Sequence, residues 1–261
     1  MADDAVDQRY GNLYARLAGY LPEDRAAVDE WQEGFLLDVA DSPRPPSRAV
    51  RELEQLIRHD PVVRMYVTEM LAGAKAPGRT VRTIPELLRA LDAVTVTAPA
   101  YNPDRKKRVA FPMSALFVRM MMTTAGEALF RQEKFNRGLQ RILKEWCTYL
   151  DGPDSRSVLN EGPDGWLSPD AAREFNLDDF EVDKGRPHWG FASYNAYFHR
   201  QIRPEKRPVD LDPDVVVSAN DGTVWQTGTD VREYDEFWVK GQPYSLRDML
   251  NGSVHTADFI G

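Results

Sequence analysis

The chain of 261 residues has a single cysteine, Cys147, and lacks a long apolar run. One cysteine cannot form a disulfide within the chain, and this composition fits a reducing compartment. The longest apolar stretches fall well short of the roughly 20 residues that a membrane-spanning helix requires. The N-terminus, MADDAVDQRY, is acidic and polar, unlike a secretory signal. We therefore expect a cytoplasmic protein without a transmembrane segment.

Positive charge is also scarce. The chain has 33 Lys and Arg against 41 Asp and Glu, which gives a formal net charge of −8. Binding of phosphates calls for a cationic face, so the sequence argues against nucleic acid as the main partner. We interpret the short basic run at residues 105–108 as a solvated loop. The four histidines show no metal-binding spacing and have no cysteine pair nearby, so we predict no metal site.

Two other features invite a chemical role and receive a structural interpretation. Cys147 follows Trp146 on a predicted amphipathic helix with no obvious base beside it, so we expect a partly buried small side chain rather than a nucleophile. Residues 120–122 are three consecutive methionines. Because adjacent residues wind around a helix, these side chains cannot share one face, and we interpret them as core residues rather than as a cofactor surface.

Helix signals dominate residues 1–185. Asp60 precedes Pro61, a proline at the first helical position, where its missing N–H costs nothing. Thr83 and Glu86 have the spacing of a capping box. Apolar residues at positions 135, 139, 142, 143, 146 and 150 form the stripe of an amphipathic helix. The predicted N-caps of this region are Ser47, Asp60, Thr83 and Ser168.

After residue 185 the pattern changes to shorter elements. Ser193 is predicted to cap a short helix, and Ser245 a final helical turn. Residues 215–217, 223–226 and 237–239 are predicted strands. The sequence thus predicts an α+β protein, with a helical N-terminal domain at residues 1–185 and the beginning of a β-rich domain at residues 186–261.

Asp221 lies between the first two predicted strands, in Asn220-Asp221-Gly222. On local grounds this is a hairpin turn, because Gly tolerates positive φ and Asn or Asp bonds to its own backbone. A tight turn is also a rigid way to present a carboxylate, so a turn at this position is compatible with a chemical role for the Asp221 side chain. Upstream, prolines after Arg203 and Arg207 predict an extended connection, and we expect the arginines to bind neighbouring carboxylates.

Three segments carry a family resemblance: WGFASYNAYFHRQIRPEKRPV, DPDVVVSANDGTV and FWVKGQPYSLRDMLNGSVHTADFIG. In this order and spacing they resemble the phosphatidylserine decarboxylase family, pyruvoyl-dependent enzymes that build their cofactor from their own backbone. The FWVKGQPYSL segment and the helical extension before it resemble the tryptophan-decarboxylase-like branch. The resemblance implies that Asp221 is the acidic residue of self-processing, where it orients a histidine that activates a serine.

The resemblance also implies a substrate and a cofactor. The substrate would be a lipid, phosphatidylserine in phospholipid biosynthesis, or a small molecule, an aromatic amino acid such as tryptophan. In the family, the serine of a Gly-Ser bond near the C-terminus becomes the pyruvoyl group, which forms a Schiff base with the substrate amine and withdraws electrons as CO₂ leaves. This chain has a Gly-Ser bond at Gly252-Ser253, but by position Asn251-Gly252 corresponds to the turn that follows the family's short helix.

We therefore expect an incomplete or split carboxy-lyase that is inactive alone and generates no pyruvoyl cofactor from this chain. Its expected partner is a C-terminal decarboxylase chain or a further copy in a homo-oligomer. One alternative is a non-catalytic scaffold or regulatory relative of a complete decarboxylase. Another is a helical binding module whose C-terminal match is coincidental.

Overall fold

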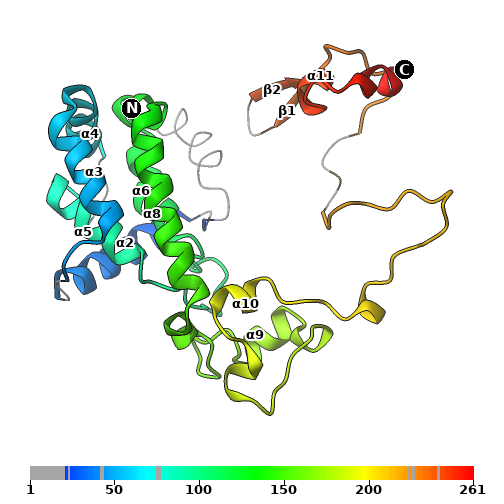
Figure 1. Ribbon diagram of the computed structural model, residues 1–261, viewed down its shortest axis with the longest axis horizontal. Coiled ribbons are helices and arrows are strands. Elements are labelled where there is room, and N and C mark those ends of the chain that lie inside the picture. The colour runs from blue at the N-terminus through cyan, green and yellow to red at the C-terminus, as the bar shows by residue number, and fades with distance from the viewer. Residues whose placement is uncertain are drawn as a thin grey trace. The chain divides into compact units, whose positions relative to one another are not determined.

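The computed structural model describes residues 21–22, 24–41, 44–74, 78–222, 224, 227–239 and 242–261. The chain divides into two compact units after Lys206. Each unit is described by itself, with the elements labelled as in Figure 1. No helix among the described residues has both the length and the apolar character needed to span a bilayer.

The first unit is built of helices. Those in its described part are α2 (Arg25–Asp41), α3 (Arg48–His59), α4 (Pro61–Gly73), α5 (Ile84–Val94), α6 (Pro112–Met121), α7 (Thr124–Phe130), α8 (Glu133–Asp151), α9 (Pro169–Glu174) and α10 (Tyr194–Phe198). Short 3-10 turns lie at Pro153–Val158, Leu177–Asp179, Pro187–Gly190 and Pro204–Lys206. Helix α3 runs alongside α8 and also packs on α4 (Figure 1).

The predicted helix starts are confirmed by side-chain caps. Ser47 Oγ accepts from the backbone N–H of Val50 at 3.3 Å, and the Asp60 carboxylate accepts at the start of α4. Thr83 and Glu86 form a reciprocal capping box at the start of α5. The side chains of Ser168 and Ser193 cap α9 and α10 in the same way. Each cap satisfies backbone donors that the first helical turn leaves unpaired.

Helices α3 to α8 enclose one apolar core. Its fully buried side chains include Leu53, Met70, Leu87, Leu91, Leu116, Phe117, Leu129, Phe135 and Ile142. Met120 is buried in this core and Met121 packs against it, whereas Met122 packs on a smaller cluster with Val118. The interpretation of the methionines as packing residues is therefore confirmed.

A second, aromatic cluster closes the first unit beyond the predicted boundary at residue 185. Trp189, Tyr194 and Tyr197 are buried in it. The backbone is also tied back, since Phe180 and Ile202 form an antiparallel bridge and the N–H of Arg203 donates to the carbonyl of Asp179. These contacts explain why the compact unit extends to Lys206 rather than ending at residue 185.

The described part of the second unit contains one small antiparallel sheet. Strands β1 (Glu236–Val239) and β2 (Gln242–Ser245) pair with Phe237 opposite Tyr244, and α11 (Leu246–Met249) and a 3-10 turn at Val254–Phe259 follow. Ser245 caps α11 as predicted, with a capping box to Asp248. The strand predicted at 237–239 is confirmed. With the helical first unit, this sheet is compatible with the α+β class.

The prediction of a strand at residues 215–217 is wrong. These residues lie in a loop, and Val216 is 98% exposed. The strand expected to pair with them, 223–226, lies mostly outside the described residues, and Val224 is not in a strand. A β-branched run becomes a strand only when a partner takes up its backbone hydrogen bonds and a surface covers one face.

Candidate functional site

Asp221, the predicted catalytic residue, lies in an exposed loop of the second unit. Its carboxylate forms an ion pair with the guanidinium of Arg207. The prediction that this arginine binds a carboxylate is confirmed, whereas Arg203 Nε donates to the backbone carbonyl of Phe180 at 3.0 Å instead. Asp221 is therefore a charged group held from one side, with 78% of its side chain exposed.

The loop at Asp221 is not the predicted hairpin turn. Ser218 organises it locally, because its hydroxyl donates to the carbonyl of Asn220 at 2.6 Å. No strand flanks Asp221 in the stretch from Arg207 to Gly222. Without paired strands the turn has nothing to join, so the carboxylate lies on a loop that the Ser218 hydrogen bond and the Arg207 ion pair restrain.

The Gly-Ser bond of the second unit has a structural role. Gly252 adopts φ +65°, where a side chain would be strained, and Ser253 Oγ accepts from the backbone N–H of His255 at 3.2 Å. His255 Nδ1 in turn lies 3.0 Å from the Asp258 carboxylate. No side-chain base of the described residues bonds to Ser253, whose hydroxyl instead caps the 3-10 turn at Val254–Phe259.

Cys147 is exposed, so the expectation of a partly buried side chain is wrong. Helix α8 buries Phe135, Leu139 and Ile142, and Cys147 lies off this stripe. The described part of the chain contains no cluster of three or more His, Cys, Asp or Glu that could hold a metal ion.

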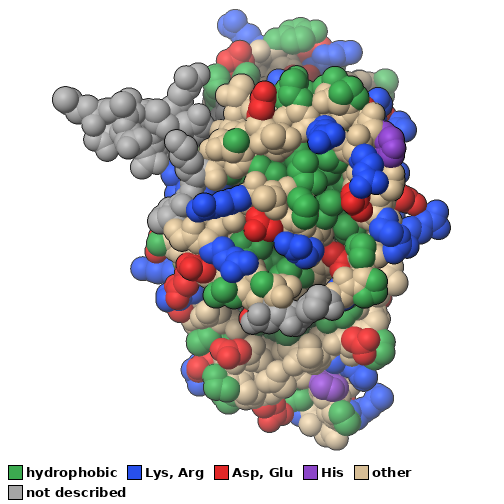
Figure 2. Space-filling view, turned by 90° about the vertical axis from the view of Figure 1, so that its left-hand side faces the viewer, with side chains coloured by type: hydrophobic (Ala, Val, Ile, Leu, Met, Phe, Trp, Pro, Cys, Tyr) green, Lys and Arg blue, Asp and Glu red, His purple; other side chains and the backbone are tan. Residues whose placement is uncertain are grey.

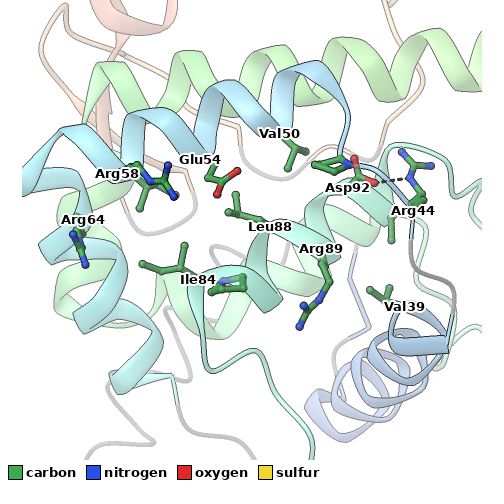
Figure 3. A pocket seen from close by; sticks show the side chains of 14 residues that line it. Val39, Arg44, Val50, Glu54, Arg58, Arg64, Ile84, Leu88, Arg89 and Asp92 are labelled. Carbon is green, nitrogen blue, oxygen red and sulfur yellow. Dashed lines mark hydrogen bonds and ion pairs between the residues drawn. The ribbon is translucent and has the colours of Figure 1, made fainter.

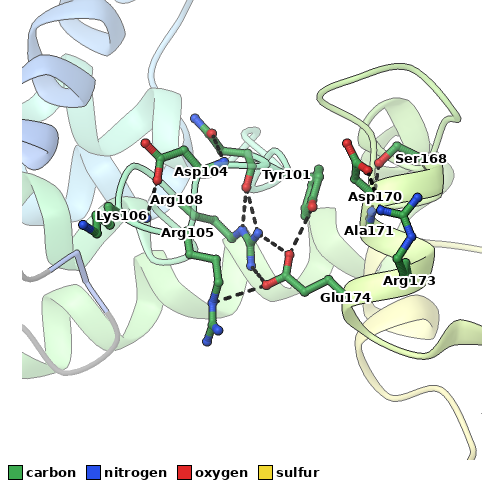
Figure 4. Close-up of polar contacts among 11 residues, drawn as sticks. Tyr101, Asp104, Arg105, Lys106, Arg108, Ser168, Asp170, Ala171, Arg173 and Glu174 are labelled. Carbon is green, nitrogen blue, oxygen red and sulfur yellow. Dashed lines mark hydrogen bonds and ion pairs between the residues drawn. The ribbon is translucent and has the colours of Figure 1, made fainter.

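The basic run at residues 105–108 is exposed at its first three residues but not at Arg108, whose side chain is only 12% exposed. Figure 4 shows why: Glu174, on α9, receives two guanidinium hydrogen bonds from Arg108, at 3.0 and 2.7 Å. Tyr101 donates to the same carboxylate at 3.0 Å, and Arg105 Nε lies 3.4 Å away. The prediction of a solvated loop is therefore wrong for Arg108.

This arrangement shifts two protonation equilibria. The hydrogen bonds from Arg108 hold the pKa of Glu174 below its usual value, with a further contribution from Tyr101. Burial, followed by the hydrogen bond to Glu174, raises the pKa of Tyr101. Glu174 therefore stays ionised and Tyr101 stays neutral, which suits a charged anchor in the wall of the aromatic cluster. Sequence reasoning missed this anchor because the two partners lie 66 residues apart.

A groove of about 460 Å³ lies between α3, α4 and α5 (Figure 3). Its floor includes Val50 and Leu88, and Arg58, Arg64 and Arg89 line its edges. Figure 2 shows one face of the molecule on which hydrophobic side chains are likewise flanked by Lys and Arg.

The main polar contact of this groove serves the fold. Asp92, only 3% exposed, pairs with Arg44 and accepts from the N–H of Ser47 at 2.6 Å. Its carboxylate thus fixes the start of α3. This structural role accounts for the buried charge, so no ligand is needed to explain it.

Family models described as phosphatidylserine decarboxylase match residues 47–175 and residues 194–261. The chain is 37% identical over 189 residues to the "Decarboxylase iboD" of Amanita muscaria, covering 66% of this chain and 54% of that protein. It is 27% identical over 232 residues to an L-tryptophan decarboxylase of Psilocybe cubensis, covering 80% and 50%. A phosphatidylserine decarboxylase proenzyme of Alteromonas mediterranea is 36% identical over 85 residues, covering 33% and 26%.

The chain belongs to the phosphatidylserine decarboxylase family. Within it, the tryptophan decarboxylase relatives support the tryptophan-decarboxylase-like branch. The chain spans about half the length of the first relatives that it matches.

Proposed function

We propose that this chain is the N-terminal part of a pyruvoyl-dependent decarboxylase and works with a further polypeptide segment that carries the pyruvoyl group. The observation that carries the proposal is the burial pattern of the second unit. Among its described side chains, the only buried one is that of Thr256, a polar residue. A β-rich catalytic domain needs an apolar core. We therefore infer that another surface covers the second unit in the working enzyme.

The exposed apolar side chains of this unit are numerous for its size. They include Val209, Leu211, Val216, Val224, Trp238, Met249, Val254, Phe259 and Ile260. Water contact with such a set is unfavourable by about 25 cal/mol per Å² of apolar surface. A second polypeptide segment that pairs with residues 215–217 and covers β1 and β2 would bury them. The expected occupant is a C-terminal decarboxylase segment, and a homo-oligomer is the competing arrangement.

In this proposal Asp221 is the acidic residue of self-processing. Its carboxylate would orient and charge-stabilise a histidine, as the acid of a Ser-His-Asp triad does. Arg207 would restrain the carboxylate until the complementary segment orders the loop. Since the hydroxyl of Ser253 caps a 3-10 turn and bonds to no side-chain base of the described residues, we assign the serine and the histidine to the complementary segment.

The proposed substrate is an α-amino carboxylate, whose amine reacts with the pyruvoyl carbonyl. The tryptophan decarboxylase relatives favour an aromatic amino acid over phosphatidylserine and phospholipid biosynthesis. The acidic composition of the chain favours the same choice, and we place the reaction in the cytoplasm.

The test is to purify the affinity-tagged chain from its own organism and measure the intact masses of everything bound to it. We expect a second polypeptide whose N-terminus is a pyruvoyl group, and release of ¹⁴CO₂ from carboxyl-labelled tryptophan or phosphatidylserine. Asp221→Asn should leave the partner chain bound and unprocessed. Asp214→Asn, which changes another exposed aspartate of the same unit, should be processed normally.

Two results would contradict the proposal. A single unprocessed chain that releases no CO₂ from either substrate would refute it, whether that chain is monomeric or a homo-oligomer. A complete decarboxylase that co-purifies and is equally active without this chain would favour a non-catalytic scaffold or regulatory relative.

A further inference from the structure

The first unit contains a second cavity, of about 610 Å³, next to the Glu174 anchor. It is formed by residues of α8 and α10, by Phe175 after α9, and by the loop that carries Arg108. Its lining is largely aromatic and includes Trp146, Trp166, Phe175, Tyr194, Tyr197 and Phe198. Its volume lies within the range of small-molecule sites, about 300 to 1,000 Å³.

The rings of this cavity are held in fixed orientations. The indole N–H of Trp166 donates to the carbonyl of Pro99 at 2.7 Å, and that of Trp146 to the carbonyl of Thr97 at 2.8 Å. Trp166 also contacts the rings of Phe175 and Tyr197, each with centroids 5.6 Å apart. Because these contacts prevent the rings from collapsing inward, the cavity is preformed.

Two polar groups in the cavity wall have no partner of their own. Tyr197 is 2% exposed, and neither its hydroxyl nor Arg200 Nε has a hydrogen-bond partner among the described residues. The Arg200 guanidinium lies over the rings of Tyr197 and Phe180, at 4.7 and 4.3 Å from their centroids. Among the described residues, the guanidinium donates one hydrogen bond, from Nη1 to the carbonyl of Tyr197 at 3.1 Å. Buried donors without acceptors are rare, and a bound water or a ligand can satisfy them.

The other arginine of the wall provides the contrast. Arg108 donates four hydrogen bonds, to both carboxylate oxygens of Glu174 and to the carbonyl of Asn102 (Figure 4). Its charge is therefore neutralised within the protein. Arg200 forms no ion pair with any carboxylate that the structure describes, and its positive charge at the cavity is uncompensated.

We propose that this cavity binds a small molecule with a planar aromatic body and a carboxylate. The rings of Trp166, Phe175 and Tyr194 would enclose the body. Arg200 and Tyr197 would donate to the carboxylate, for which a guanidinium is the best-matched partner.

The Tyr197 hydroxyl and the exposed part of the cavity wall both suit this ligand. Burial raises the pKa of Tyr197 to about 12, so its hydroxyl keeps its proton and can donate. Phe198, one of the lining residues, is 58% exposed, so this part of the cavity wall reaches solvent. The site lies within the first unit and does not involve Asp221, so it goes beyond the proposed decarboxylase function.

Isothermal titration of the full chain with 2-naphthoate tests the proposal. We expect binding tighter than about 1 mM and at least about tenfold weaker binding of 2-naphthamide, its neutral counterpart. Decanoate tests the aromatic body and should also bind more weakly. Equal affinity for naphthoate and naphthamide, or preference for decanoate, would overturn the proposal, the latter in favour of an acyl-chain site. Absence of naphthoate binding would overturn it as well.

Two variants and a control locate the site. Arg200→Gln should weaken naphthoate binding at least about tenfold and leave naphthamide binding unchanged. Since this change also removes packing against Phe180, Tyr197→Phe serves as a second variant that keeps the ring. It should weaken naphthoate binding by about fivefold without lowering Tm. Arg173→Gln, on the exposed face of α9, should change neither, and a wild-type affinity in both Arg200→Gln and Tyr197→Phe would refute the assignment.

Discussion

Helices α5 and α11 begin with the same kind of cap but differ in how much of each helix is buried. Each starts with a reciprocal capping box, Thr83 with Glu86 in the first unit and Ser245 with Asp248 in the second. Helix α5 then buries Leu87, Leu88, Ala90, Leu91, Asp92 and Val94, whereas α11 buries none of its residues. The same local signal thus produces a helix in both units, but only in the first unit are residues of that helix buried.

This contrast extends to the whole of each unit. The first has an apolar core under α3 to α8 and a second, aromatic cluster. The described side chains of the second unit form no such core. Stability follows buried apolar area, so the first unit should fold by itself and the second should depend on what covers it. The following predictions test this difference, from the largest expected effect to the smallest.

The largest effect is expected from removal of a core ring. Phe135 is fully buried and packs edge-on against Phe130, at a centroid distance of 5.5 Å. Phe135→Ala should lower the free energy of unfolding by about 3 to 5 kcal/mol. The matched change in the second unit, Phe259→Ala at a 58% exposed ring, should change it by less than about 0.5 kcal/mol. Chemical denaturation followed by circular dichroism measures both, and equal losses would contradict the comparison.

A smaller effect is expected at the Glu174 anchor. Glu174→Gln leaves the largely buried Arg108 without its carboxylate and should cost about 2 kcal/mol at neutral pH. Since the folded pKa of Glu174 lies below its usual value of 4.5, its contribution is complete above that pH and is lost as the pH falls through the folded pKa.

The difference in unfolding free energy between wild type and Glu174→Gln should therefore shrink below pH 4.5. Thermal unfolding from neutral to acid pH measures it. Glu127→Gln, at an exposed pair on α7, is the control and should have no measurable effect. A Glu174→Gln difference that stays constant with pH would show that the carboxylate charge is not what stabilises this wall.

The smallest effect compares the two capping boxes. Thr83→Ala should lower the unfolding free energy of the first unit by about 1 kcal/mol, because an N-cap hydrogen bond is lost in a helix that belongs to the core. Ser245→Ala removes the same kind of hydrogen bond from α11 but should leave the unfolding free energy of the first unit unchanged. Urea titrations of both variants provide the measurement, and a common shift would indicate that the units unfold together.

Local chemistry explains how much of this fold could be predicted. The caps at Ser47, Asp60, Thr83 and Ser245 were predictable because each depends on residues within one helical turn. The strand at 215–217 was predicted wrongly because a strand depends on a partner distant in the sequence.

The candidate site shows the same limit. The role of Asp221 in self-processing came from family resemblance and stays a prediction, whereas its contact with Arg207 was expected from the charges nearby. The Glu174 anchor and the Arg200 cavity join residues from separate helices and loops. No periodicity or spacing in the sequence brings these residues together, so they could be found only in the structure.

Hydrogen exchange of the purified chain tests most directly the claim that the two units differ in self-sufficiency. At the lowest workable concentration, backbone amides of α3 and α8 should be strongly protected, and those of β1 and β2 should exchange with little protection. Addition of the complementary decarboxylase segment should then protect β1 and β2. Protection of β1 and β2 equal to that of α8 in the isolated chain would contradict the account.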